Sequence, residues 1–193
     1  KNKKMNYGPV TTFSNYSIVS ENRLVKKPKY IDRKIATLFG CALSTGAGMV
    51  LKQSKISQNN NVLVYGLGGI GFCSLVTLLA IKQKNIYVYD LNKDKVRLAE
   101  KFGAKKIDLD LKQKKYLNFF DVCIETCGQT NTIEKGLDLI KNKGTLIFAS
   151  HPSKNKKIKI KPHDLIKGKK IIGSWGGSTN LEKDLSKYFK ILK

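Results

Sequence analysis

The chain has 193 residues, which is enough for one sizeable domain with a small part of a second. Hydrophobic residues make up 41% of the chain, as in ordinary globular proteins. No apolar run reaches the roughly 18–20 residues that span a bilayer, and the sequence does not open with a secretory leader. We therefore expect a cytoplasmic protein. The net charge is +23, but only three of the 37 basic residues are arginine, so we expect a solvated lysine surface rather than a nucleic-acid-binding one.

The first 61 residues are predicted to hold one strand and two helices. Thr12 to Val19 has a strand-like pattern, followed by a turn at Glu21-Asn22. Asp32 can cap a helix in which apolar residues recur at helical spacing, and Ser44 is expected to cap a second helix that runs to about Ser54. Lys55 to Asn61 is polar and predicts a short loop.

Beyond this loop, short apolar strands alternate with helical patterns. This alternation predicts an α/β protein with six parallel strands in the order 3-2-1-4-5-6, a doubly wound sheet of the Rossmann type. The predicted strands are Val62 to Tyr65, Ile86 to Tyr89, Lys105 to Ile107, Asp121 to Ile124, Thr145 to Ala149 and Lys170 to Ser174. The predicted helices are Ile70 to Lys82, Lys93 to Lys101, Thr130 to Ile140 and Leu181 to Ile191.

The strongest motif is Gly66-Leu67-Gly68-Gly69-Ile70-Gly71, between the first of these strands and the helix that follows. Gly66 permits a tight turn, Gly68 lets the backbone approach a pyrophosphate, and Gly71 lets the helix press against the sheet. The phosphates would sit on free backbone N–H groups at the positive end of the helix dipole. A plain strand-to-helix turn is the alternative.

A carboxylate supports the dinucleotide interpretation. Asp90 ends the next predicted strand, 19 residues after Gly71, where it can accept hydrogen bonds from the adenosine ribose. An acidic residue there favours NAD, because the 2′-phosphate of NADP would meet like charge.

Four segments together resemble the zinc-containing medium-chain dehydrogenases, and the resemblance covers about Pro9 to Leu185. They are GPVTTFSNYSIVSENRLVKKP, GCALSTGAGMVLK, VYGLGGIGFCSL and VYDLNKDKVRLAEKFGA. The resemblance implies that residues 1–30 are a remnant of a GroES-like catalytic domain and that 31–193 form the NAD-binding Rossmann domain. It also implies an NAD-dependent, zinc-type oxidoreductase that transfers hydride between NAD and an alcohol, aldehyde or ketone, and that forms dimers through the strand at 170–174.

The resemblance also assigns residues to the site. Cys41 would be one ligand of a catalytic zinc. The residues that it places at the cofactor, in addition to the glycine motif 66–71 with its Leu67, Gly69 and Ile70, are Thr45, Asp90, Lys95, Cys127, Phe148 and Ser150. The alternative for Cys41 is a buried, inert thiol.

The remaining cysteines and the histidines fit no metal site or disulfide framework. Cys73 and Cys123 fall in a predicted helix and strand and are expected in the core, and the pair Cys123 and Cys127 lacks the second ligand pair of a structural zinc site. His151 and His163 are given no role, with a ligand contact as the alternative for His151.

Two departures from the family pattern affect the interpretation. A catalytic zinc needs three protein ligands, and the chain supplies at most Cys41, so we expect a fragment truncated at both ends that is inactive alone. The connection from Asp108 to Phe120 has 13 residues, close to the minimum for a crossover with a helix, so the adenine side of the cofactor site is expected to differ in shape.

Three alternative functions stay open. A zinc-free, NADPH-dependent quinone or enoyl reductase conflicts with Cys41 and Asp90. A non-catalytic dinucleotide-binding module would use the same motif without chemistry. A nucleic-acid-binding protein would use the densest lysine clusters, Lys112 to Lys115 and Lys154 to Lys161.

Overall fold

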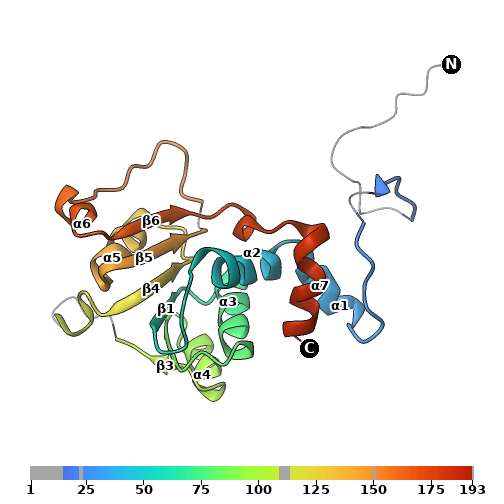
Figure 1. Ribbon diagram of the computed structural model, residues 1–193, viewed down its shortest axis with the longest axis horizontal. Coiled ribbons are helices and arrows are strands. Elements are labelled where there is room, and N and C mark those ends of the chain that lie inside the picture. The colour runs from blue at the N-terminus through green and yellow to red at the C-terminus, as the bar shows by residue number, and fades with distance from the viewer. Residues whose placement is uncertain (1–14, 22–23, 109–113, 150, 193) are drawn as a thin grey trace.

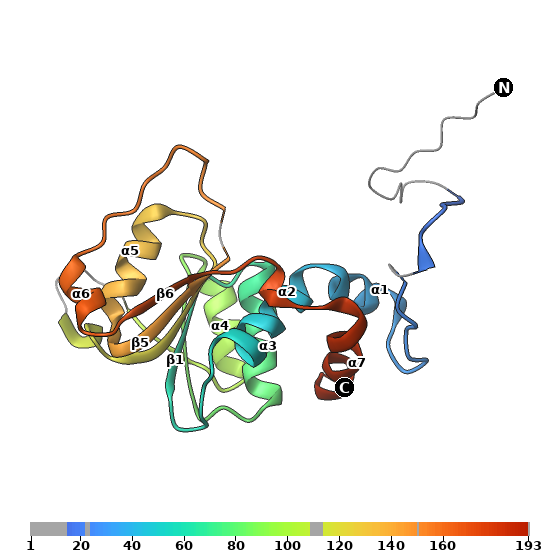
Figure 2. The same cartoon turned by 45° about the horizontal axis from the view of Figure 1, so that its top comes forward.

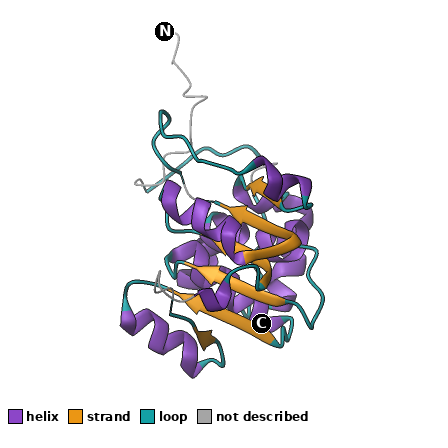
Figure 3. Cartoon of the chain, turned by 90° about the vertical axis from the view of Figure 1, so that its left-hand side faces the viewer, coloured by secondary structure: helices purple, strands orange, loops and turns teal. Residues whose placement is uncertain are grey.

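The structure is a computed structural model that describes residues 15–21, 24–108, 114–149 and 151–192. One six-stranded parallel sheet forms the centre, in the order β3-β2-β1-β4-β5-β6 (Figures 1 and 3). The predicted strand order is confirmed. The strands are β1 (Asn61–Tyr65), β2 (Asn85–Tyr89), β3 (Lys105–Lys106), β4 (Phe120–Glu125), β5 (Ile140–Phe148) and β6 (Lys170–Gly173).

Helices cover both faces of the sheet because its central strands are apolar on both sides. α3 (Gly69–Ala80) and α4 (Lys93–Lys101) pack on one face, around Val64, Leu75 and Ala99. α5 (Thr130–Leu139) packs on the other, around Leu63, Ile133 and Leu137. These are three of the four predicted helices, and α4 has the predicted bounds. A short α6 (Pro162–Ile166), which has a proline in its first turn, leads into β6.

A third cluster joins the N-terminal helices to the last one (Figure 2). α1 (Arg33–Ala36), η2 (Thr37–Gly40), α2 (Ala42–Gly48) and η3 (Met49–Gln53) precede the sheet, and α7 (Leu181–Ile191) follows it. The rings of Phe39 and Phe189 lie 4.4 Å apart, and Lys52 forms an ion pair with Asp184 at 2.5 Å. No single helix of the described residues is long and apolar enough to cross a membrane; the segments 33–40 and 42–53 reach that length and composition only as a pair, bent by 59°.

Two predictions before the sheet are wrong. Residues 15–19 form no strand, and residues 12–14 lie outside the described part. Ser44 does not cap a helix: α2 already begins at Ala42, and the buried Ser44 hydroxyl donates instead to the carbonyl of Phe39. Asp32, by contrast, caps α1 as predicted, since its carboxylate accepts from the N–H of Lys34 at 2.7 Å.

The strand at 105–107 shortens to two residues, and the one at 145–149 begins earlier, at Ile140. β5 follows α5 without a loop, and its register with β4 shifts between Phe120 and Val122. Of the connection from Asp108 to Phe120, the described part contains only a single 3-10 turn, η4 (Lys114–Tyr116). Cys123 is fully buried, as expected, whereas Cys73 is only half-buried.

Candidate functional site

The glycine turn 66–71 joins β1 to α3 at the carboxyl edge of the sheet. Gly66 has a φ of +96°, a conformation that side chains disfavour. A Cβ on Gly71 would lie 1.9 Å from the carbonyl oxygen of Gly66, so only glycine lets the helix start this close to the turn. The steric roles predicted for these two glycines agree with this geometry.

The turn is fixed from both neighbouring strands. On the β2 side, the N–H of Gly66 donates to the carbonyl of Tyr89 at 2.8 Å, and the Asp90 carboxylate accepts from the N–H of Leu67 at 2.6 Å. On the β4 side, the Thr126 hydroxyl donates to the carbonyl of Gly66 at 2.9 Å. Asp90 therefore helps to shape the turn, in addition to the ribose contact predicted for it.

The first turn of α3 is suited to an anion. Its N-cap is Gly68, no side chain caps it, and its first turn contains no acidic residue. A Cβ on Gly68 would meet no atom of the described residues within 4 Å, so the space beside the turn is open. Since the first N–H groups of a helix have no intrahelical partner and carry the positive end of the dipole, this end fits a phosphate group.

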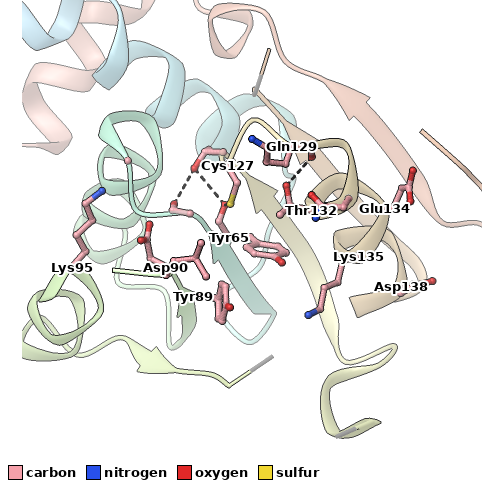
Figure 4. Close-up of a pocket in the computed structure, with 15 residues that line it drawn as sticks. Tyr65, Tyr89, Asp90, Lys95, Cys127, Gln129, Thr132, Glu134, Lys135 and Asp138 are labelled. Carbon is pink, nitrogen blue, oxygen red and sulfur yellow. Dashed lines mark hydrogen bonds between the residues drawn. The ribbon is translucent and has the colours of Figure 1, made fainter. Parts of the chain in front are cut away.

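A cavity of about 810 Å³ lies on the β2 side of the turn (Figure 4). Its wall includes five of the residues predicted at the cofactor, namely Gly66, Gly68, Asp90, Lys95 and Cys127. Tyr65 and Tyr89 line it from the sheet, and Thr132 and Lys135 line it from α5. This cavity, called the adenosine-side cavity below, follows the carboxyl ends of β1, β2 and β4, where the strand order reverses.

A second cavity, of about 420 Å³, lies on the other side of the turn and is called the nicotinamide-side cavity below. It brings together Cys41, Thr45 and Ile70, three of the predicted site residues, with His151 and Trp175 at its mouth. The rings of His151 and Trp175 meet edge to face, with centroids 5.5 Å apart. His151 therefore lines this cavity, a position that agrees with the ligand contact left open for it as an alternative rather than with a residue without a role.

The resemblance also implies that Cys127, Phe148 and Ser150 line the nicotinamide pocket, but neither Cys127 nor Phe148 lines this second cavity. Phe148 lines neither cavity; its side chain packs in the cluster on the α5 face, and its carbonyl accepts from the N–H of Ser174 at 2.8 Å. Cys127 opens to the adenosine-side cavity instead. Ser150 lies outside the described residues.

Cys127 is held in an environment that disfavours its thiolate. Its thiol donates to the carbonyl of Tyr65 at 3.3 Å, and its N–H donates to the fully buried Glu125 carboxylate at 2.8 Å. The residue as a whole is exposed, but its thiol is partly desolvated; this desolvation first, and then the neighbouring Glu125 and Asp90 carboxylates, raise the pKa of the Cys127 thiol to about 12. At neutral pH this cysteine therefore lines the cavity as a protonated thiol and does not act as a nucleophile.

We predict that Cys127 resists alkylation at neutral pH. With a pKa of about 12, its thiolate fraction at pH 8 is on the order of a thousandfold below that of an ordinary cysteine, so labelling by iodoacetamide should be slow and should accelerate about tenfold per pH unit between pH 7 and pH 10. Peptide mapping by mass spectrometry gives this rate for each cysteine. Urea-unfolded chain is the control, and a rate at Cys127 that levels off by pH 9 in the folded chain would contradict the raised pKa.

The resemblance assigns a single zinc ligand, Cys41, to this chain. Cys41 is exposed in the nicotinamide-side cavity, but no three His, Cys, Asp or Glu side chains of the described part gather closely enough to hold a metal ion. A catalytic zinc site needs three protein ligands. The described residues alone therefore do not form one.

Sequence reasoning missed three side chains. Tyr65 and Tyr89 read as ordinary strand residues, yet both line the adenosine-side cavity. Ser174 is buried against the nicotinamide-side cavity, and its hydroxyl has no hydrogen-bond partner within the part of the chain that the structure describes. Their position in the sequence could have identified them, since each lies at the carboxyl end of a predicted strand, where ligands bind in open α/β sheets.

Comparisons with known proteins agree with this geometry. Residues 69–193 match the family model described as zinc-binding dehydrogenase. The chain is 28% identical over 196 residues to the class-3 alcohol dehydrogenase of Drosophila melanogaster, a match that covers 93% of this chain and 52% of that protein. The fold is similar to benzyl alcohol dehydrogenase from Acinetobacter calcoaceticus, with a TM-score of 0.85, 21% identity, and coverage of 94% of this chain and 52% of that one.

The fold is also similar to acetophenone reductase from Geotrichum candidum, solved in complex with NAD. There the TM-score is 0.70 at 22% identity, over 86% of this chain and 47% of that one. The chain thus spans about half the length of the relatives that it matches.

Proposed function

Because the chain belongs to the zinc-binding dehydrogenase family, we propose that it provides the NAD-binding unit of an alcohol-dehydrogenase-like oxidoreductase. The observation that carries this proposal is the glycine turn, which presents an uncapped helix N-terminus between two cavities. Within this proposal, residues 31–193 form the cofactor domain and residues 1–30 belong to a catalytic domain. The substrate would be a small alcohol, aldehyde or ketone, and the location would be cytoplasmic.

Each side of the turn has a separate task. The N–H groups of the first turn of α3 hold the diphosphate, and Asp90 with Lys95 holds the adenosine ribose. Thr45 and Ile70 position the nicotinamide ring in the second cavity, whose described lining contains no Asp, Glu, Lys or Arg, as suits a neutral ring. When bound, NAD supplies the hydride acceptor or donor.

Cys41 is proposed only as one ligand of a catalytic zinc, because the described residues bring no second or third ligand to it. No catalytic step is assigned to the metal. Dimerisation through β6 is likewise a proposal. β6 is an edge strand of the sheet, and such edges can pair with a second copy.

The cofactor preference is the direct test of this function. We predict that NADH binds at least tenfold more tightly than NADPH, because the 2′-phosphate would face the Asp90 carboxylate. Titration that follows quenching of Trp175, the single tryptophan of the chain, measures both dissociation constants. Asp90→Asn keeps an acceptor for the N–H of Leu67 and should reduce the difference in affinity between NADH and NADPH. Asp94→Asn is the control, because the Asp94 side chain is 82% exposed on α4, and it should leave that difference unchanged.

Each of the alternative functions predicts a different binding result. Tighter binding of NADPH would favour a reductase of the zinc-free type. Binding of neither nucleotide by a folded chain would reject the proposed function. Binding to DNA that persists at high salt would favour nucleic acid as the partner, because contacts made by lysines alone weaken steeply with ionic strength.

A further inference from the structure

A third cavity, of about 470 Å³, lies at the edge of the sheet opposite to the glycine turn. Asn60, Asp121 and Lys170 line it where β1, β4 and β6 begin. Val122, Thr145 and Lys170 form one row of its wall across three strands, because Val122 pairs with Thr145 and Thr145 pairs with Lys170. This cavity, called the amino-edge cavity below, shares no lining residue with the two cavities beside the glycine turn.

The wall of the amino-edge cavity is positively charged. Three lysines line it, namely Lys55 after η3, Lys143 in β5 and Lys170 in β6, and none of them forms an ion pair with a described residue. Its described lining contains one carboxylate, that of Asp121, and the ammonium of Lys141 lies 3.0 Å from it. The three lysine charges are therefore not balanced within the part of the chain that the structure describes.

The backbone holds two of these lysines in a conformation that residues with side chains seldom adopt. The φ angle is +47° at Lys55 and +64° at Lys143. Such conformations cost free energy and are concentrated at binding and catalytic sites. The stem of Lys143 also packs on the turn before β6, since a Cβ at Gly168 would lie 3.3 Å from the Lys143 Cγ. The fold therefore fixes where Lys143 enters the wall.

The donors in this wall suit phosphate oxygens. A lysine ammonium is a compact cation with three donors and is a common phosphate ligand in proteins. The Thr145 hydroxyl and the Asn142 amide add neutral donors to the same wall. Three cations around one cavity thus favour an anion with several oxygens over a neutral ligand.

The cavity is larger than a phosphate ion needs. A volume of about 470 Å³ lies within the range of pockets that hold small organic ligands. Val122 and Ile172 give it an apolar part, and both belong to the hydrophobic cluster on the α3 face of the sheet. Gln53 also lines the cavity, and its side-chain oxygen is buried without a hydrogen-bond partner among the described residues, so a ligand hydroxyl would satisfy it.

We propose that the amino-edge cavity binds a small organic phosphate, with its phosphate group among the ammonium groups of Lys55, Lys143 and Lys170 and its carbon part beside Val122 and Ile172. This site is separate from the proposed NAD site and does not depend on it, because the two lie at opposite edges of the sheet. Nucleic acids carry the same phosphate chemistry, and the experiment distinguishes the two sources.

The test titrates the isotopically labelled chain with glycerol 3-phosphate, inorganic phosphate and a short DNA duplex, followed by the amide resonances in NMR spectra. Glycerol 3-phosphate should shift the amides of residues 53–55, 142–145 and 170, and should bind more tightly than inorganic phosphate. The double variant Lys55→Gln with Lys170→Gln removes two charged donors and should weaken this binding about tenfold.

The double variant Lys183→Gln with Lys187→Gln is the matched control. Both lysines are exposed on α7 and line none of the three cavities, so the net charge changes equally but the cavity does not. It should change the affinity for glycerol 3-phosphate less than about twofold, because distant surface charges are screened. Thermal melting checks that both double variants are folded, and both should bind NADH as the parent does.

Three results would overturn the proposal. Equal weakening by the two double variants would show that only the net charge attracts the anion. Shifts confined to residues 66–71 would place the phosphate at the start of α3 alone. A DNA duplex that shifts the amides of the amino-edge cavity at lower concentrations than glycerol 3-phosphate does would make nucleic acid the partner of this surface.

Discussion

Replacing Gly71 with alanine is expected to lower the free energy of unfolding by about 3 kcal/mol and to abolish NADH binding. The new methyl group would lie 1.9 Å from the carbonyl oxygen of Gly66 and 2.7 Å from the Thr126 hydroxyl. Neither atom can move aside easily, because the carbonyl belongs to the backbone and the Thr126 hydroxyl is held by its hydrogen bond to that same carbonyl. The start of α3 must therefore move away from the sheet, and the turn loses its shape.

Urea unfolding followed by circular dichroism measures the stability, and fluorescence titration measures the binding. Gly69→Ala is the matched control two residues earlier, where the nearest atom would be the Ala42 methyl at 3.9 Å. That variant should keep the parent stability within about 1 kcal/mol, since alanine favours helix more than glycine does. Equal unfolding midpoints for Gly71→Ala and the parent would contradict the packing described for the turn.

Gly48→Ala is expected to destabilise the chain by about 2 kcal/mol and to weaken the binding of the nicotinamide end of the cofactor. A Cβ at Gly48 would lie 2.2 Å from the carbonyl oxygen of Gly177, in the turn after β6. α2 packs directly against this turn, and Thr179 donates to the carbonyl of Ser44 at 2.9 Å. A methyl group at Gly48 would push α2 away from the turn at Gly177 and so displace Thr45, which lines the nicotinamide-side cavity.

Gly40→Ala serves as the control for the stability of this second variant, because a Cβ there would meet nothing within 4 Å. Binding of reduced nicotinamide mononucleotide is compared with that of the parent chain, since Gly40 itself lines the nicotinamide-side cavity. If Gly48→Ala binds the mononucleotide as tightly as the parent does, Thr45 does not depend on the packing between α2 and the turn at Gly177.

Patterns that depend on one strong local signal were predictable from the sequence. The apolar run Val62 to Tyr65 followed by glycines predicts a central strand and a turn, and the structure has β1 and the start of α3 there. The order of the six strands follows from right-handed crossovers and is confirmed. α4 matches its predicted bounds because Asn92 caps it and Phe102 ends it.

Features that depend on tertiary contacts were not predictable. Ser44 has a good capping side chain, but α2 starts earlier because its residues from Leu43 to Gly48 are buried against α3 and the turn at Gly177. The packing of Tyr116 and Phe119 against Tyr87 cannot be read from spacing along the chain. The same holds for the Asp90 carboxylate, whose bond to the N–H of Leu67 joins two strands.

A crystal structure of the chain with NADH tests the central claim most directly. We predict diphosphate oxygens about 3 Å from the backbone nitrogens of residues 68–71, with the two ends of the cofactor in the two flanking cavities. A structure in which the diphosphate binds elsewhere, with the helix N-terminus facing only water, would contradict the account.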